Sequence, residues 1–163
     1  YLKFYGENHP SVAILYLCMG YAYFNNKNYG LALEFFAKCK KIAKKFYSEN
    51  NVEVLNIDFN IGNVYFGLEA YDQALVHYLK PVKGWMESLG IKHLSMSKIH
   101  NNLGLLANRV NYEKMSSDNW KKVFTLYKNI IKDNKTELLR FRLWIGAQDI
   151  RRVLSTFEYE VTV

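Results

Sequence analysis

Residues 20–36, GYAYFNNKNYGLALEFF, and residues 62–78, GNVYFGLEAYDQALVHY, are two versions of one pattern. Each stretch begins with Gly, and it carries Tyr nine residues later, Ala twelve residues later and an aromatic residue sixteen residues later. The glycines keep one interval of 42 residues along the chain, at Gly20, Gly62, Gly104 and Gly146. Because a fixed period of this length is typical of repeat architectures, the sequence predicts a chain built from similar units.

Each unit is predicted to be a pair of antiparallel helices. Segment 28–48 shows apolar residues at the three- and four-residue steps of an amphipathic helix. We expect the Gly of the first helix to allow close approach to the second, whose Ala receives it. The aromatic residue would fill the space between neighbouring units. Because one pair cannot cover its own apolar face, the pairs must stack.

The fold class predicted is all-α, a right-handed solenoid of stacked antiparallel helix pairs. We expect helices over residues 10–25, 28–48, 51–67, 71–88, 92–109, 112–132 and 136–157. The repeats would span 10–50, 51–91, 92–133 and, in part, 136–158, within one solenoid segment over residues 1–163. Pro81 falls inside the fourth helix and predicts a kink there, because its ring removes a helical hydrogen bond.

The Gly, Tyr, Ala and Phe/Tyr positions resemble the tetratricopeptide repeat. The period of 42, with GENHPSVA at residues 6–13 and NNLG at residues 101–104, is similar to the kinesin-light-chain-type variety. The resemblance covers residues 6–133 well and 136–158 weakly. It implies a scaffold or adaptor that binds other proteins, of the kind found in cargo adaptors, signalling scaffolds and cytoskeletal or ciliary assemblies.

The resemblance also implies where a peptide or helix of a partner would bind. In such repeats the first helices line the concave surface, at positions six, three and two before the Gly and one and four after it. An Asn side chain both donates and accepts hydrogen bonds, which suits the backbone of an extended ligand. The predicted groove residues are Tyr21, Phe24, Asn56, Asn60, Asn63, Phe66, Lys98, Asn101, Asn102 and Asn108. The alternative is that the asparagines are ordinary solvated surface.

One specialised kind of groove is not predicted. Some tetratricopeptide domains clamp the C-terminal carboxylate of chaperones with Lys and Asn in the first unit, Asn in the second, and Lys and Arg in the third. This sequence has Asn60 and Lys98 at matching places. It has Leu17, Tyr21 and Asn102 at the other three. Most of the positive charge is missing, so we expect no binding of chaperone tails.

Two alternative functions stay open, and the charge of the chain bears on one of them, the binding of RNA. The formal net charge is +7, which suits an acidic partner without specifying one. A run of lysines is expected to face water on the convex side: Lys38, Lys40, Lys41, Lys44 and Lys45. The alternatives are a basic helical-repeat module that binds RNA and a regulatory domain of a larger enzyme. The 42-residue period is longer than that of repeats that read RNA bases, so nucleic acid is not the favoured partner.

Composition and motifs exclude several other classes. Half of the residues are apolar and 16% are aromatic, too many for a disordered chain. The longest apolar stretch, residues 12–24, is shorter than the ~18 residues of a membrane span. Two cysteines fit a reducing compartment, so we expect a cytoplasmic protein, and the resemblance implies the cytoskeleton or a cilium as candidate sites. No enzyme motif is present and the histidines lack partners at ligand spacing, so we predict no catalytic residues, metal or cofactor.

Two further expectations concern burial. Cys39 stands where Ala is usual in the repeat, so we expect it to be a small buried residue. Segment 10–25 is apolar nearly all round, which predicts burial on both sides. Because terminal repeats normally carry a polar outer face, we expect additional repeats or another chain to cover this one, in a segment cut from a longer array.

Overall fold

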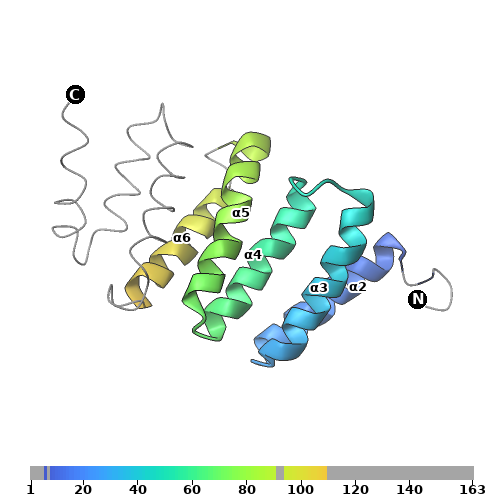
Figure 1. The fold of residues 1–163 in the computed structure, drawn as a ribbon, viewed down its shortest axis with the longest axis horizontal. Coiled ribbons are helices and arrows are strands. Elements are labelled where there is room, and N and C mark those ends of the chain that lie inside the picture. Colours follow the sequence, from blue (N-terminus) through green and yellow to red (C-terminus); the bar gives the residue numbers. More distant parts are fainter. Residues whose placement is uncertain (1–5, 7, 91–93, 110–163) are drawn as a thin grey trace. The chain divides into compact units, whose positions relative to one another are not determined.

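The structure, a computed structural model, describes residue 6, residues 8–90 and residues 94–109. Within these residues every regular element is a helix (Figure 1). The helices are α2 (Pro10–Asn25), α3 (Tyr29–Phe46), α4 (Val52–Gly67), α5 (Tyr71–Leu89) and α6 (Leu94–Arg109). The all-α prediction is confirmed. The helices predicted over 112–132 and 136–157 lie outside the described residues.

The first four helices form two stacked pairs. Helix α2 packs against α3 and α4 packs against α5, while α3 also contacts α4 (Figure 1). Both pairs belong to one of two compact units of the chain, Tyr1–Leu103, and the other is Gly104–Val163. The two stacked pairs share a single buried cluster, which includes Val12 from α2, Phe36 from α3 and Val64 from α4. The fold is therefore an α-solenoid of antiparallel helix pairs.

The helices begin at side-chain caps that the sequence provides. The Asn28 side chain accepts a hydrogen bond from the Leu31 amide at 3.4 Å, and the Asn51 side chain accepts one from the Glu53 amide at 2.9 Å. An N-cap residue of this kind is not itself helical. The helices α3 and α4 accordingly start one residue later than the sequence predicted, at Tyr29 and Val52.

The loops inside the two pairs have the same backbone conformation. Lys27 and Glu69 stand 42 residues apart, and both have φ of 58°. In each loop the next amide donates to the carbonyl five residues earlier, at 2.9 Å. A left-handed residue followed by such a hydrogen bond is a common way for an α-helix to end. The described pairs thus repeat at the interval of the sequence, down to single backbone hydrogen bonds.

The glycines lie where an aromatic ring rests on the first helix. A Cβ atom added at Gly20 would lie 2.5 Å from the Phe36 ring, and one added at Gly62 would lie 2.7 Å from the Tyr78 ring. The expected close approach is therefore confirmed at both crossings. The aromatic residue covers the glycine of its own pair and also reaches the next unit, since Phe36 shares a buried cluster with α4 and the Tyr78 hydroxyl accepts a hydrogen bond from Asn102. The surroundings of Gly104 and Gly146 lie outside the described residues.

Helix α5 continues without interruption through Pro81, which is buried. A bend at Pro81 stays a prediction. A Cβ atom at Gly84 would overlap the side chain of Leu55 on α4. This glycine, expected only to ease a bend, therefore has a packing role, since it admits a neighbouring helix.

Burial agrees with the sequence on α3 more closely than on α2. Cys39 is buried, as predicted, and burial raises the pKa of its thiol to about 12. Phe46 has the apolar spacing of the same face, yet it is 53% exposed. On α2, Ile14 is 63% exposed and Leu15 is 38% exposed, so the described residues do not bury this helix on both sides.

Candidate functional site

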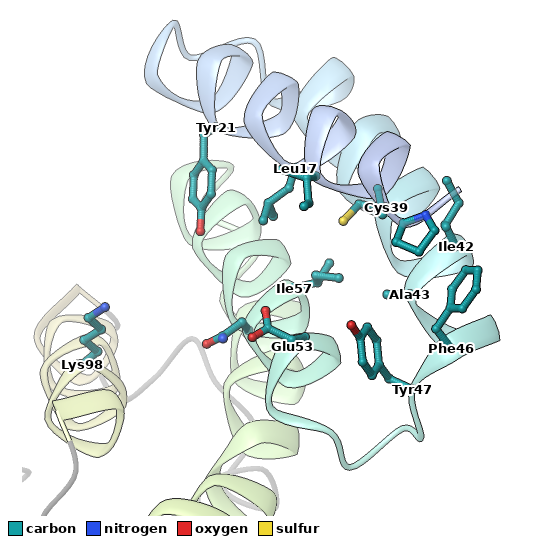
Figure 2. A pocket seen from close by; sticks show the side chains of 14 residues that line it. Leu17, Tyr21, Cys39, Ile42, Ala43, Phe46, Tyr47, Glu53, Ile57 and Lys98 are labelled. Atoms are coloured by element: carbon teal, nitrogen blue, oxygen red, sulfur yellow. The ribbon is translucent and has the colours of Figure 1, made fainter. Parts of the chain in front are cut away.

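A groove of about 530 Å³ lies beside α2, where α3 and α4 form its other walls (Figure 2). We call it the α2 groove. Its lining consists of Pro10, Ala13, Ile14, Leu17 and Tyr21 on α2, Cys39, Ile42, Ala43 and Phe46 on α3, Tyr47 after it, Glu53, Asn56 and Ile57 on α4, and Lys98 on α6. A hollow of this size is in the range that ligands occupy in proteins.

The α2 groove has a buried apolar floor and an exposed apolar rim. Ile42, Ala43 and Ile57 on the floor are each less than 7% exposed. Ile14 and Phe46 on the rim are 63% and 53% exposed. Large apolar side chains from separate helices thus remain in water around one hollow. Contiguous exposed apolar surface rimmed by polar residues is typical of an interaction site.

Few polar groups border this apolar surface. The Tyr21 hydroxyl, the Tyr47 hydroxyl and the Glu53 carboxylate point into the space beneath α2 (Figure 2). Burial raises the pKa of the Tyr21 hydroxyl, so it is neutral at physiological pH. Glu53 and Lys98 are the charged residues of the lining, and neither side chain has a hydrogen bond or ion pair with the described residues. Among the described residues, both charged groups thus keep the capacity to pair with a ligand.

Three of the ten predicted groove residues line this hollow, namely Tyr21, Asn56 and Lys98. Two others lie at helix ends: Phe24 packs on Tyr29, with ring centroids 6.0 Å apart, and Phe66 packs on Tyr71 at 5.9 Å. Asn101 is exposed. The side chain of Asn108 lies outside the described residues.

The remaining predicted asparagines link the first helices of successive units. The Asn60 amide donates to the Tyr21 hydroxyl at 2.7 Å, and the Asn102 amide donates to the Asn63 side-chain oxygen at 2.6 Å. The Tyr78 hydroxyl also donates to Asn63, at 2.9 Å. We call these contacts the interhelix ladder. These asparagine amides were predicted to bind the backbone of a ligand, and within the chain they already have hydrogen-bond partners. Their contact with a ligand stays a prediction.

The sequence reasoning missed most of the apolar lining. Ile14 and Leu17 stand six and three residues before Gly20, at positions of the same groove register that was applied to the second and third units. That register therefore carried a signal for them. No such signal existed for Phe46 and Tyr47, because they belong to the end of the second helix of the pair.

A buried charge cluster lies at the contact of α3, α4 and α5. The Asp58 carboxylate is 4% exposed and accepts hydrogen bonds from Lys40 at 2.6 Å and from His77 at 3.0 Å. Lys80 lies 3.9 Å away. Burial acts to raise the pKa of Asp58, but the hydrogen bonds from His77 and Lys40 outweigh it and hold the pKa below its usual value.

The basic run on α3 is not simply a solvated face. Lys40 was expected to face water, but its side chain is only 23% exposed, because the buried carboxylate of α4 requires a cation beside it. Lys38 pairs with Glu34 at 2.5 Å, and Lys44 pairs with Glu49. Much of the positive charge of this helix is thus neutralised within the chain.

The described residues contain no group of three His, Cys, Asp or Glu side chains placed to hold a metal ion. Among the described helices, none has the length and hydropathy that a membrane crossing requires.

Stacked antiparallel helix pairs with a groove beside their first helices define the class of α-solenoid repeat proteins. Residues 11–80 match the family model of the tetratricopeptide repeat. The crystal structure of BtubC (BKLC) from P. vanneervenii is similar, with a TM-score of 0.60 and 18% identity, over 91% of this chain and 59% of that chain. No curated protein matches the sequence.

These similarities establish the tetratricopeptide-type solenoid fold. At 18% identity the likeness to BtubC shows the fold alone, and this chain spans about three-fifths of that protein, 59% of its length. Tetratricopeptide repeats generally mediate protein–protein interaction and are typically non-enzymatic scaffolds. The resemblance to the 42-residue, kinesin-light-chain-type variety stays a prediction.

Proposed function

We propose that this chain is an interaction scaffold that receives a segment of a partner protein in the α2 groove. The observation that carries the proposal is the set of apolar side chains that α2 and the end of α3 leave exposed around one hollow of about 530 Å³. Covering such surface is favourable by about 25 cal/mol for each Å² removed from water. A partner that fills the hollow therefore gains binding energy without any change in the fold.

The lining supports binding rather than bond making or breaking. Its thiol, Cys39, is buried and has a pKa of about 12, so it stays protonated at neutral pH. A nucleophile needs a lowered pKa or a base beside it, and Cys39 has the opposite environment. The proposed activity is therefore recognition.

Nucleic acid is the less favoured partner. Phosphate binding requires free cations on one face. In the basic run of α3, Lys38, Lys40 and Lys44 already pair with carboxylates of this chain. A regulatory role beside a catalytic domain is compatible with the same groove and differs only in the origin of the partner segment.

The setting that we propose is a cytoplasmic assembly built on the cytoskeleton, a cilium or a motor–cargo complex, and it rests on the resemblance of the repeats alone. We also propose that further repeats or another chain cover the outer side of α2. The exposed apolar side chains of Leu15, Cys18 and Ala22 recur there at helical spacing and support this second contact.

The proposal is tested by affinity capture with the 163-residue chain and with the Ile14→Asp variant. Ile14 is 63% exposed, so the new charge alters the groove and not the core. The matched control is Val76→Asp on α5, where the side chain is 52% exposed and lies outside the groove lining. We expect Ile14→Asp to weaken binding of the captured partner about tenfold or more, as measured by titration with the purified partner.

Circular dichroism should show equal helix content in both variants and in the original chain. Equal capture by the original chain and Ile14→Asp would remove the α2 groove as the binding site. Loss of the partner in both variants would indicate a general surface effect and would also contradict the proposal. A captured nucleic acid whose affinity falls steeply between ~50 and 200 mM salt would favour the RNA alternative.

A further inference from the structure

We propose that the ligand of the α2 groove is an amphipathic α-helix that carries a basic residue opposite Glu53. This inference rests on the proposed function, because it specifies the partner of the same groove. It is carried by the hydrogen-bonding capacity of the walls, by the spacing of apolar groups on α2 and by the charge at the groove.

The walls of the groove favour a ligand that satisfies its own backbone. An extended peptide buries N–H and C=O groups that must find partners, and an unpaired buried amide is costly. The polar lining offers the amide of Asn56, two tyrosine hydroxyls and the charged groups of Glu53 and Lys98, too few to pair with every backbone group of an extended segment. The amides of Asn60 and Asn102, which would otherwise serve such a peptide, donate within the interhelix ladder. A helix needs none of these groups, because its backbone bonds are internal.

The apolar groups on α2 have the spacing of a helix–helix contact. Ile14, Leu17 and Tyr21 line the groove from one face of α2, three and four residues apart. A ligand helix lying along α2 would place its own residues i, i+3 or i+4, and i+7 against this face and over the floor. The exposed rim, with Ile14 63% and Phe46 53% exposed, leaves room for the outer face of such a helix in water.

The charge at the groove selects the polar partner. Glu53 is the acidic residue of the lining, and its carboxylate points into the space beneath α2 (Figure 2). The other charged lining residue, Lys98, belongs to α6. A Lys or Arg of the ligand would therefore meet, beside the apolar floor, a carboxylate that pairs with none of the described side chains.

The test is a display library of 16-residue peptides, randomised at every position and selected on the 163-residue chain. Sequences that also bind Ile14→Asp are discarded, so that only groove-dependent peptides remain. We expect the survivors to carry large apolar residues at i, i+3 or i+4, and i+7, with Lys or Arg at one fixed place. Their circular dichroism should show helix forming on binding.

Charge reversal then examines the basic residue directly. Glu53→Lys should weaken the selected peptides about five- to tenfold at low salt and less at high salt, while Glu69→Lys, an exposed loop change outside the lining, should have no effect. Groove-dependent peptides that are extended, Pro-rich or acidic would overturn this inference and leave the proposed function standing. Selection of no groove-dependent peptide would overturn the inference, and capture with Ile14→Asp would judge the proposed function separately.

Discussion

The side-chain amide of Asn60 donates a hydrogen bond to the hydroxyl of Tyr21 at 2.7 Å, across the gap between α2 and α4. The relationship recurs 42 residues later, where the amide of Asn102 donates to the side-chain oxygen of Asn63 at 2.6 Å. In both places the residue after the repeat glycine meets the residue two before the next one. The interhelix ladder thus holds the first helix of one unit against the first helix of the next. It uses residues at positions that the repeat pattern assigned to the groove.

Removing the Tyr21 hydroxyl should therefore affect stability. Tyr21→Phe leaves the amide of Asn60 without its partner, and we expect a loss of about 1 kcal/mol in the free energy of unfolding. The matched control is Tyr23→Phe, whose ring stacks on Phe35 at 5.3 Å and whose hydroxyl makes no hydrogen bond with the described residues. Urea titration should show no comparable loss in that variant. Equal losses would mean that the ladder contributes nothing.

Replacing Gly by Ala should have opposite effects on the free energy of unfolding at a helix crossing and at an open position. Gly62→Ala places a Cβ atom 2.7 Å from the Tyr78 ring, and overpacking of this kind costs about 1–3 kcal/mol. Gly30→Ala on α3 meets nothing within 4 Å, so we expect a gain of about 0.5–1 kcal/mol from the better helix former. Thermal unfolding of both variants measures the difference. A neutral Gly62→Ala would show that the ring can move aside and that the crossing is not tight.

The repeat interval and local signals within single helices predicted much of this fold. The interval between glycines located both close crossings, and the ranges of the described helices α2 to α6 were correct to within two residues, because caps such as Asn28 and Asn51 are local signals. The groove was harder. The sequence cannot tell whether Asn60 pairs with a ligand or with Tyr21, 39 residues earlier, because that depends on how two helices pack. The exposure of Phe46 depends on the same packing.

The buried carboxylate of Asp58 predicts a pH dependence. Hydrogen bonds from His77 and Lys40 hold its pKa in the folded chain below the ordinary value of ~3.9, despite the opposing effect of burial. The unfolded chain therefore binds this proton at higher pH than the folded chain does. The resulting stability is present above pH ~4 and is lost as pH falls through the folded pKa.

Asp58→Asn should accordingly cost roughly 1–3 kcal/mol at pH 7, because Lys40 loses its partner in a site where Asp58 is only 4% exposed. The cost should shrink as pH falls below ~4 and through the folded pKa of Asp58, because the original carboxyl then becomes neutral as well. Glu34→Gln removes the exposed pair with Lys38 and should leave stability almost unchanged, because water screens that pair. Urea titrations at pH 7 and pH 3.5 compare the variants. A cost independent of pH would exclude a charge effect.

The left-handed residues of the two equivalent loops predict stabilising substitutions. Lys27 and Glu69 both have φ of 58°, which costs a residue with a Cβ atom about 1 kcal/mol relative to Gly. Part of that gain is lost because Gly has more freedom in the unfolded chain, so we expect Lys27→Gly and Glu69→Gly each to add about 0.5 kcal/mol. Chemical unfolding provides the measurement. A loss at either site would mean that the side chain itself contributes to the loop.

The two cysteines should report whether α2 stays closed over the floor of the groove. Cys18 is exposed, whereas Cys39 is buried and has a pKa of about 12, so only about one thiol in 10⁴ is ionised there at pH 8. Iodoacetamide at pH 8 should modify the native chain once, at Cys18, and should reach Cys39 only in denaturant.

In the Cys18→Ser variant, mass spectrometry follows the alkylation of Cys39 alone. The alkylation rate of Cys39 in the folded chain, divided by that in the unfolded chain, measures how often the packing of α2 on α3 opens. Alkylation of Cys39 within tenfold of the unfolded rate would mean that the floor is open to solvent, and the groove described above would then lack a rigid base.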